Sequence, residues 1–204
     1  MPVFSYFTIE SPAKGLYREK GSKFLSFAYP VETESAIKLK IEALRKEYYD
    51  ARHHCFAWVL GADKNKFRAF DDGEPNHSAG DPILGQIKSK DLTDVLVVVV
   101  RYFGGTKLGV GGLISAYKTS AADALNNAKI IEKEVAEVWH LHYSYPSTPE
   151  IMRLVKEFDL MIVNQKFEST CEVQVEVTNR DSKKVMERIT LLQAMGVDVR
   201  LSDL

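Results

Sequence analysis

A glycine-rich run between an apolar strand and a small-residue helix constrains this chain more than any other feature. The apolar strand is expected over residues 95–100 and the helix over residues 113–128. Glycine lets a backbone take positive φ or approach another group closely. A helix start adds free N–H groups and the positive end of the helix dipole. The pattern therefore predicts a strand-to-helix turn whose backbone can hold an anion such as a phosphate.

The side chains around this run extend the prediction from an anion to a nucleic acid. Lysine and arginine can hold a phosphate backbone, and exposed aromatic side chains can stack on bases. For Tyr102 and Phe103 a core position and an exposed one both stay open, whereas for Phe67 and Phe70 we favour the core. An equally strong alternative is that the glycines only permit tight packing. The predicted binding residues are Arg101, Tyr102, Phe103, Gly104, Gly105, Lys107, Gly109, Gly111, Gly112 and Lys118.

An acidic turn supplies the second group of candidates. Asp71, Asp72 and Glu74 can hold Mg²⁺ through oxygen ligands. Asp-Gly is also a common turn sequence, and we favour a turn over a metal site. His53 and His77 are added to this possible loop site. On a strand only His53 and Cys55 would share a face, which is too few ligands for zinc. We predict no metal, no cofactor and no catalytic residue, because no nucleophile has an evident base.

Several short motifs together resemble the YigZ/IMPACT family. They are the glycine-rich run, Asp71-Asp-Gly-Glu-Pro75, the Ala79-Gly80-x-Pro82-Ile-Leu84 stretch, Ser22-Lys23-Phe24 and Ala51-Arg-His53. They cover roughly residues 15–130 of the chain. The chain departs from the family pattern at Asn76-His77-Ser78, where Ser-Gly-Thr is expected.

The resemblance implies a fold and a function. Residues 1–131 would form a β/α domain similar to one shared by a small-subunit ribosomal protein and the fourth domain of the translocation elongation factor. Residues 132–204 would form the small second domain of bacterial members. The implied function is that of a non-enzymatic cytosolic regulator linked to translation, which binds RNA, the ribosome or a translation factor.

Periodicity independently predicts an α+β protein. In the first domain it indicates two strands around Gly21, a helix capped by Thr33, a hairpin at 53–60 and 66–70, and a short helix at 82–88. In the second it indicates strands at 135–145, 160–167, 170–177 and 197–201. Helices are expected after Ser147 or Thr148 and at 181–195. This β-α-β-β-α-β order is ferredoxin-like.

Charge and cysteine content limit the function classes. The 204 residues have a net charge of −1, which excludes a polycation that coats nucleic acid. Residues 1–130 hold 18 Lys and Arg against 15 Asp and Glu, and residues 131–204 hold 9 against 13. Cys55 and Cys171 suit free thiols in a reducing cytosol. We expect no signal peptide, no membrane contact and a cytoplasmic location.

Two other functions stay open. One is a phosphate- or nucleotide-binding enzyme that uses the glycine-rich run together with Mg²⁺ at the acidic turn. The other is a protein-interaction module, in which the acidic second domain is the docking surface for a protein partner.

Overall fold

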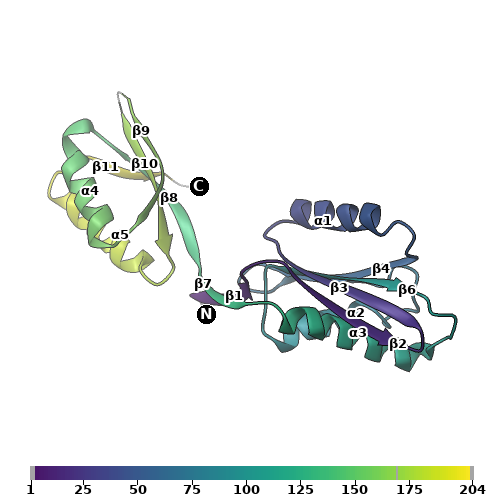
Figure 1. The fold of residues 1–204 in the computed structure, drawn as a ribbon. Coiled ribbons are helices and arrows are strands. Elements are labelled where there is room, and N and C mark those ends of the chain that lie inside the picture. The colour runs from purple at the N-terminus through teal and green to yellow at the C-terminus, as the bar shows by residue number, and fades with distance from the viewer. Residues whose placement is uncertain (1–2, 169, 203–204) are drawn as a thin grey trace. The chain divides into compact units, whose positions relative to one another are not determined.

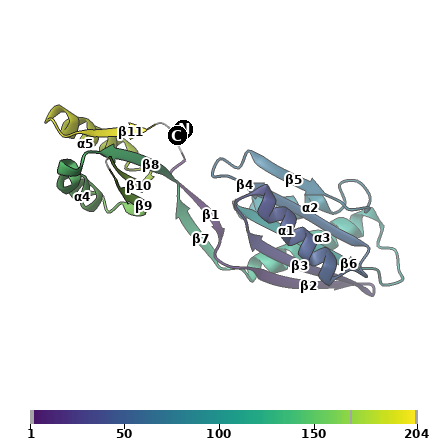
Figure 2. The same ribbon diagram turned by 90° about the horizontal axis from the view of Figure 1, so that it is seen from above.

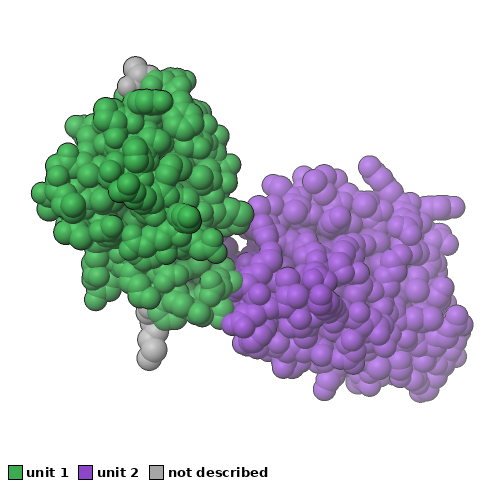
Figure 3. All heavy atoms as spheres, turned by 60° about the vertical axis from the view of Figure 1, so that its left-hand side comes forward, with its two compact units in different colours: residues 1–5, 134–204 green, residues 6–133 purple. Residues whose placement is uncertain are grey.

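The computed structural model describes residues 3–168 and 170–202 and shows an α+β fold, as the sequence predicts (Figure 1). The chain divides into two compact units (Figure 3). One unit comprises Tyr6–Lys133, and the other comprises Met1–Ser5 with Glu134–Leu204. Both cysteines are buried and free. Among the described residues, no helix combines the length and the apolar character needed to span a membrane.

The first unit is built on a five-stranded antiparallel sheet with the strand order β2-β3-β6-β4-β5 (Figure 2). The central strand β6 has no exposed surface from Val95 to Val100, since both of its faces are covered. Strands β2 and β5 form the two edges. The strands are β2 (Ala13–Glu19), β3 (Ser22–Pro30), β4 (His53–Leu60), β5 (Lys66–Phe70) and β6 (Val95–Tyr102).

Helices cover both faces of this sheet (Figure 1). Helix α1 (Glu34–Glu47) packs Ile37 and Leu44 on one face, and Thr33 caps it by accepting a hydrogen bond from the Ala36 N–H at 3.1 Å. Helices α2 (Gly80–Ser89) and α3 (Gly109–Asn126) pack on the other face. The two faces therefore carry separate apolar cores.

Two features of the fold differ from the prediction. Helix α3 begins at Gly109 rather than at Leu113, because burial of Leu113, Ala116 and Tyr117 favours the helix despite its glycines. A two-stranded sheet that pairs β1 (Ser5–Ile9) with β7 (Ile130–Glu134) was not predicted from the sequence. Its strands lie far apart in the chain, so no local hairpin signal marks them.

The second unit has the predicted β-α-β-β-α-β order, and its strands are arranged β11-β8-β10-β9. The alternating residues Cys171, Val173, Val175 and Val177 of β10 are buried, as their pattern predicts. The elements are β8 (Ala136–Tyr143), a short 3-10 turn η1 (Tyr145–Ser147), α4 (Thr148–Glu157), β9 (Met161–Phe167), β10 (Cys171–Thr178), α5 (Ser182–Ala194) and β11 (Val199–Ser202).

Candidate functional site

Three glycines build the turn between β6 and α3. A Cβ on Gly104 would lie 1.9 Å from the carbonyl carbon of Gly21 and 2.1 Å from the nitrogen of Ser22, so only glycine fits there. The Gly104 N–H donates to Ser22 Oγ at 3.1 Å. Gly105 and Gly109 have φ of +85° and +73°, the left-handed region that favours glycine. Close packing therefore requires glycine at position 104, whereas the backbone conformation favours it at positions 105 and 109.

Gly111 is different, because nothing within the unit requires a glycine there. It stands in the first turn of α3, is exposed, and a Cβ on it would meet no atom within 4 Å. A glycine inside a helix costs about 1 kcal/mol relative to alanine. The helix also has no side-chain cap at its start and no acidic residue in its first turn. Bare backbone with open N–H groups is thus presented to solvent at this point.

Basic and apolar side chains surround this bare backbone. Lys107 and Lys118 are exposed and have no ion-pair partner among residues 3–168 and 170–202. Phe103 and Val110 are each 53% exposed, and Ile114 is 39% exposed. Val110, Ile114 and Lys118 follow one another at intervals of four along α3, so they lie on one side of the helix. We call the exposed surface of residues 103–118 the glycine-loop surface.

Arg101 does not belong to this exposed surface. Its side chain is buried, and its guanidinium pairs with Glu74 at 2.5 Å. The guanidinium also lies 5.4 Å from the centre of the Phe24 ring and 5.7 Å from that of Phe103. Tyr117, which is fully buried, donates to the same Glu74 oxygen at 2.7 Å. The structure thus joins the two sequence motifs through a buried ion pair. This pairing was not predicted from the sequence. Glu74 and Arg101 are 27 residues apart, and no sequence pattern identifies a charged residue's partner at that separation.

The two aspartates of the acidic turn hold neighbouring backbone in place. Asp71 accepts hydrogen bonds from the N–H groups of His77, Ala79 and Gly80 at 2.8–3.0 Å, which fills the start of α2. Partial burial raises the pKa of Asp71, but these backbone hydrogen bonds outweigh it and hold the pKa below its usual value. Asp72 accepts from the His54 N–H at 2.7 Å and from Arg45 at 3.0 Å. Both carboxylates are therefore engaged by hydrogen-bond donors of the same unit.

The remaining candidates of the loop site are also engaged within the unit. His53 Nδ1 lies 2.9 Å from the carbonyl oxygen of Asp72, and exposed His77 pairs with Asp81 at 2.6 Å. Cys55 is fully buried, and burial raises the pKa of its thiol. Within the described part of the chain, no three His, Cys, Asp or Glu side chains come together as a metal site. These contacts give the loop a structural role.

The aromatic candidates divide differently from the prediction. Tyr102 is half-buried and donates to Asp50 at 2.7 Å, a hydrogen bond that raises its pKa to about 12. The core placement of Phe67 and Phe70 is wrong, because these side chains are 50% and 36% exposed. They lie on β5, an edge strand. Their exposure leaves aromatic surface at this side of the unit.

Comparison with known proteins reveals relatives along nearly the whole chain. Residues 20–125 match the family model described as the Impact N-terminal domain. "IMPACT family member YvyE" of Bacillus subtilis is 30% identical over 202 residues, which cover 99% of this chain and 93% of that protein. "IMPACT family member YigZ" of Escherichia coli is 36% identical over 152 residues, 74% of each chain. A crystal structure of a hypothetical protein superposes with a TM-score of 0.77 and 29% identity, covering 100% of this chain and 98% of that one.

Proposed function

This chain belongs to the IMPACT family, and from that membership we propose that it is a translation-linked protein that binds ribosomal RNA through the glycine-loop surface. The translation link follows from the family resemblance of the sequence motifs. The choice of surface follows from the structure of the first unit. In this proposal Arg101 has a structural role and does not touch the RNA. The RNA contact is made by Lys107, Lys118 and the backbone of residues 104–112.

The observation that carries this proposal is the bare start of α3. Gly111 has no packing reason to be glycine, and the helix start has no cap. A phosphate oxygen can accept the open N–H groups there, because a helix start favours negative charge. Lys107 and Lys118 add two cations without partners in the described residues. A phosphodiester backbone complements this combination.

Exposed apolar surface beside these groups favours nucleic acid over a simple anion. Phe103 is 53% exposed next to the turn. A base can stack on such a ring, whatever its identity. Free inorganic phosphate would leave the Phe103 and Val110 side chains unused. We therefore favour an RNA segment with an accessible base over a small anion.

The acidic turn does not favour the alternative of a nucleotide-binding enzyme. It requires Asp71, Asp72 and Glu74 to bind Mg²⁺ beside the glycine-rich run. Asp71 and Asp72 accept backbone hydrogen bonds, and Glu74 neutralises Arg101 in a buried pair. Freeing Glu74 would leave the Arg101 charge buried and unpaired, which is costly.

The proposal is tested by sedimentation of the tagged full-length protein from native lysate on a sucrose gradient. We expect the protein to migrate with ribosomal fractions, to leave them after ribonuclease treatment, and to lose them in a Lys107→Ala/Lys118→Ala variant. A Lys46→Ala/Arg52→Ala variant removes the same charge from exposed positions elsewhere and should migrate normally. Migration of the wild type at the top of the gradient in every sample would refute the proposal.

Protein interaction is the second candidate, and β9 favours it. This strand is an edge of its sheet and exposes Met161, Val163 and Phe167 by 61%, 51% and 56%. An exposed apolar edge can pair with an added strand from another protein. Co-sedimentation that survives ribonuclease and the lysine substitutions would support this candidate instead.

A further inference from the structure

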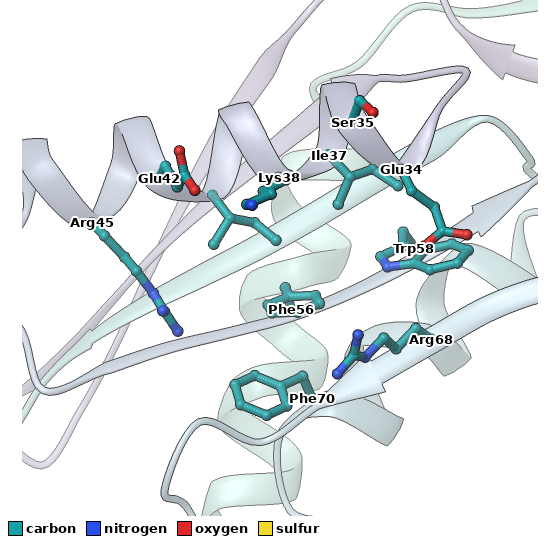
Figure 4. A pocket seen from close by; sticks show the side chains of 11 residues that line it. Glu34, Ser35, Ile37, Lys38, Glu42, Arg45, Phe56, Trp58, Arg68 and Phe70 are labelled. Carbon is teal, nitrogen blue, oxygen red and sulfur yellow. The ribbon is translucent and has the colours of Figure 1, made fainter.

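A groove opens on the α1 face of the first unit, beside the sheet edge formed by β5 (Figure 4). Its volume is about 510 Å³, within the range of small-molecule sites. Helix α1 forms one wall, and residues of β4 and β5 form the floor. The glycine-loop surface includes the start of α3, which packs on the opposite face of the sheet (Figure 1). The groove is therefore separate from the site proposed above.

The floor of the groove is aromatic because of the strand register. Phe56 pairs with Phe70, and Trp58 pairs with Arg68, which places all four side chains on one face of the sheet. The Phe56 and Phe70 ring centroids are 5.2 Å apart, with the planes inclined at 35°. Phe56 and Trp58 are nearly buried, whereas Phe70 is 36% exposed. Phe70 thus offers ring surface to a flat ligand.

Cationic groups converge on this floor. Arg45 and Arg68 direct their guanidinium groups toward the two rings, and Lys38 lines the groove from α1 (Figure 4). The Arg68 guanidinium lies 5.9 Å from the centre of the Phe70 ring. Lys38 and Arg68 have no ion-pair partner in the described residues, whereas Arg45 shares its charge with Asp72 at 3.0 Å. Two cations that no carboxylate of the described residues neutralises are therefore available to an anionic ligand.

Two carboxylates complete the lining. Glu34 and Glu42 project from α1, and neither forms an ion pair within the described residues. A carboxylate accepts hydrogen bonds from amino and hydroxyl groups. A ligand for this groove should therefore combine a flat ring, a negative charge and hydrogen-bond donors.

We infer that the groove binds a nucleotide unit, with its base stacked on Phe70 and its phosphate held by Lys38 and Arg68. The base supplies the flat ring, the phosphate supplies the charge, and exocyclic amino groups and ribose hydroxyls supply donors for Glu34 and Glu42. The same chemistry is offered by a free mononucleotide and by one nucleotide of a single-stranded RNA. This inference does not rest on the proposed function, because the groove and the glycine-loop surface use different residues.

Trp58 supplies an internal probe for the test. The chain has two tryptophans, so Trp139→Phe leaves Trp58 alone. We would excite this full-length variant at the red edge of tryptophan absorption and titrate AMP, a single-stranded oligoadenylate RNA and inorganic phosphate. Isothermal titration of the wild type repeats the measurement without the background substitution. Saturable quenching by AMP or RNA is expected, and phosphate should need at least about tenfold higher concentration, because stacking contributes to binding.

Matched substitutions locate the bound nucleotide. Lys38→Ala/Arg68→Ala should weaken binding at least about tenfold, since both cations of the phosphate contact are lost. Lys46→Ala/Arg52→Ala makes the same charge change outside the groove, and Lys107→Ala/Lys118→Ala removes the glycine-loop cations; both should bind normally. Tighter binding of RNA than of AMP would identify RNA as the source, and equal binding would identify the free nucleotide. Absence of saturable binding, equal binding of phosphate, or preference for a mixed-charge peptide over both nucleotides would overturn the inference.

Discussion

Arg101 Nη1 lies 2.5 Å from Glu74 Oε1, and at most 7% of either side chain is exposed. This contact ties the end of the central strand to the acidic turn. Tyr117 donates to the same carboxylate oxygen from α3, so three elements meet at one buried group. Arg101 and Glu74, which looked available for a ligand in the sequence, are therefore engaged with each other inside the first unit.

Removing one partner of this pair should destabilise the first unit strongly. We expect Arg101→Met or Glu74→Gln alone to lower the free energy of unfolding by about 3–5 kcal/mol. The reason is that each variant leaves the charge of the other residue buried without its partner. The double variant should cost less than the two single changes added together. Urea unfolding followed by circular dichroism measures all three. Losses below about 1 kcal/mol for both single variants would show that the pair is not buried in solution.

Gly104 and Gly111 should respond in opposite ways to alanine. Gly104→Ala places a Cβ 1.9 Å from the Gly21 backbone and should cost several kcal/mol of unfolding free energy, on the order of an overpacked core. Gly111→Ala meets open space and should add up to about 1 kcal/mol through helix propensity. Thermal unfolding of both variants gives the comparison. Under the proposed function, Gly111→Ala should also weaken ribosome association while the protein becomes more stable.

His77 occupies a backbone conformation that suits glycine, the residue expected there from the family pattern. Its φ is +64°, in the left-handed region. His77→Gly should relieve strain of about 1 kcal/mol, partly offset by the loss of the exposed contact with Asp81. We therefore expect a net gain of less than about 1 kcal/mol in chemical denaturation. A loss of more than about 1 kcal/mol would mean that the histidine side chain stabilises the loop.

Stability should fall as the pH drops below about 6.5, and His54 should contribute to the fall. Burial is the largest influence on the His54 side chain, and it lowers the pKa of this imidazole from its usual 6.5. The unfolded chain then binds the proton more readily than the folded one, so unfolding free energy decreases with falling pH until the folded histidine also titrates. His54→Phe should flatten this part of the stability profile. An unchanged slope between pH 7 and 5 would exclude His54 as its source.

Local sequence patterns determined the elements of this protein and their class. Some features depend only on residues a few positions apart, so the sequence alone predicts them. They are the alternation in β10, the Thr33 cap of α1 and the apolar run of β6. The order of elements in the second unit followed from the same patterns. The glycine-rich run identified the family and the strand-to-helix turn, because such a run is unusual by itself.

Only the tertiary structure decided which of the candidate residues are available to a ligand. Formal charge in the sequence does not show pairing, and Arg101 and Glu74 meet only because β6 and the acidic turn pack together. Exposure of Phe70 depends on its place on an edge strand, and the β1–β7 pair joins strands that lie far apart in the chain. Burial and pairing are properties of contacts between distant parts of a chain, and neither composition nor periodicity encodes those contacts locally.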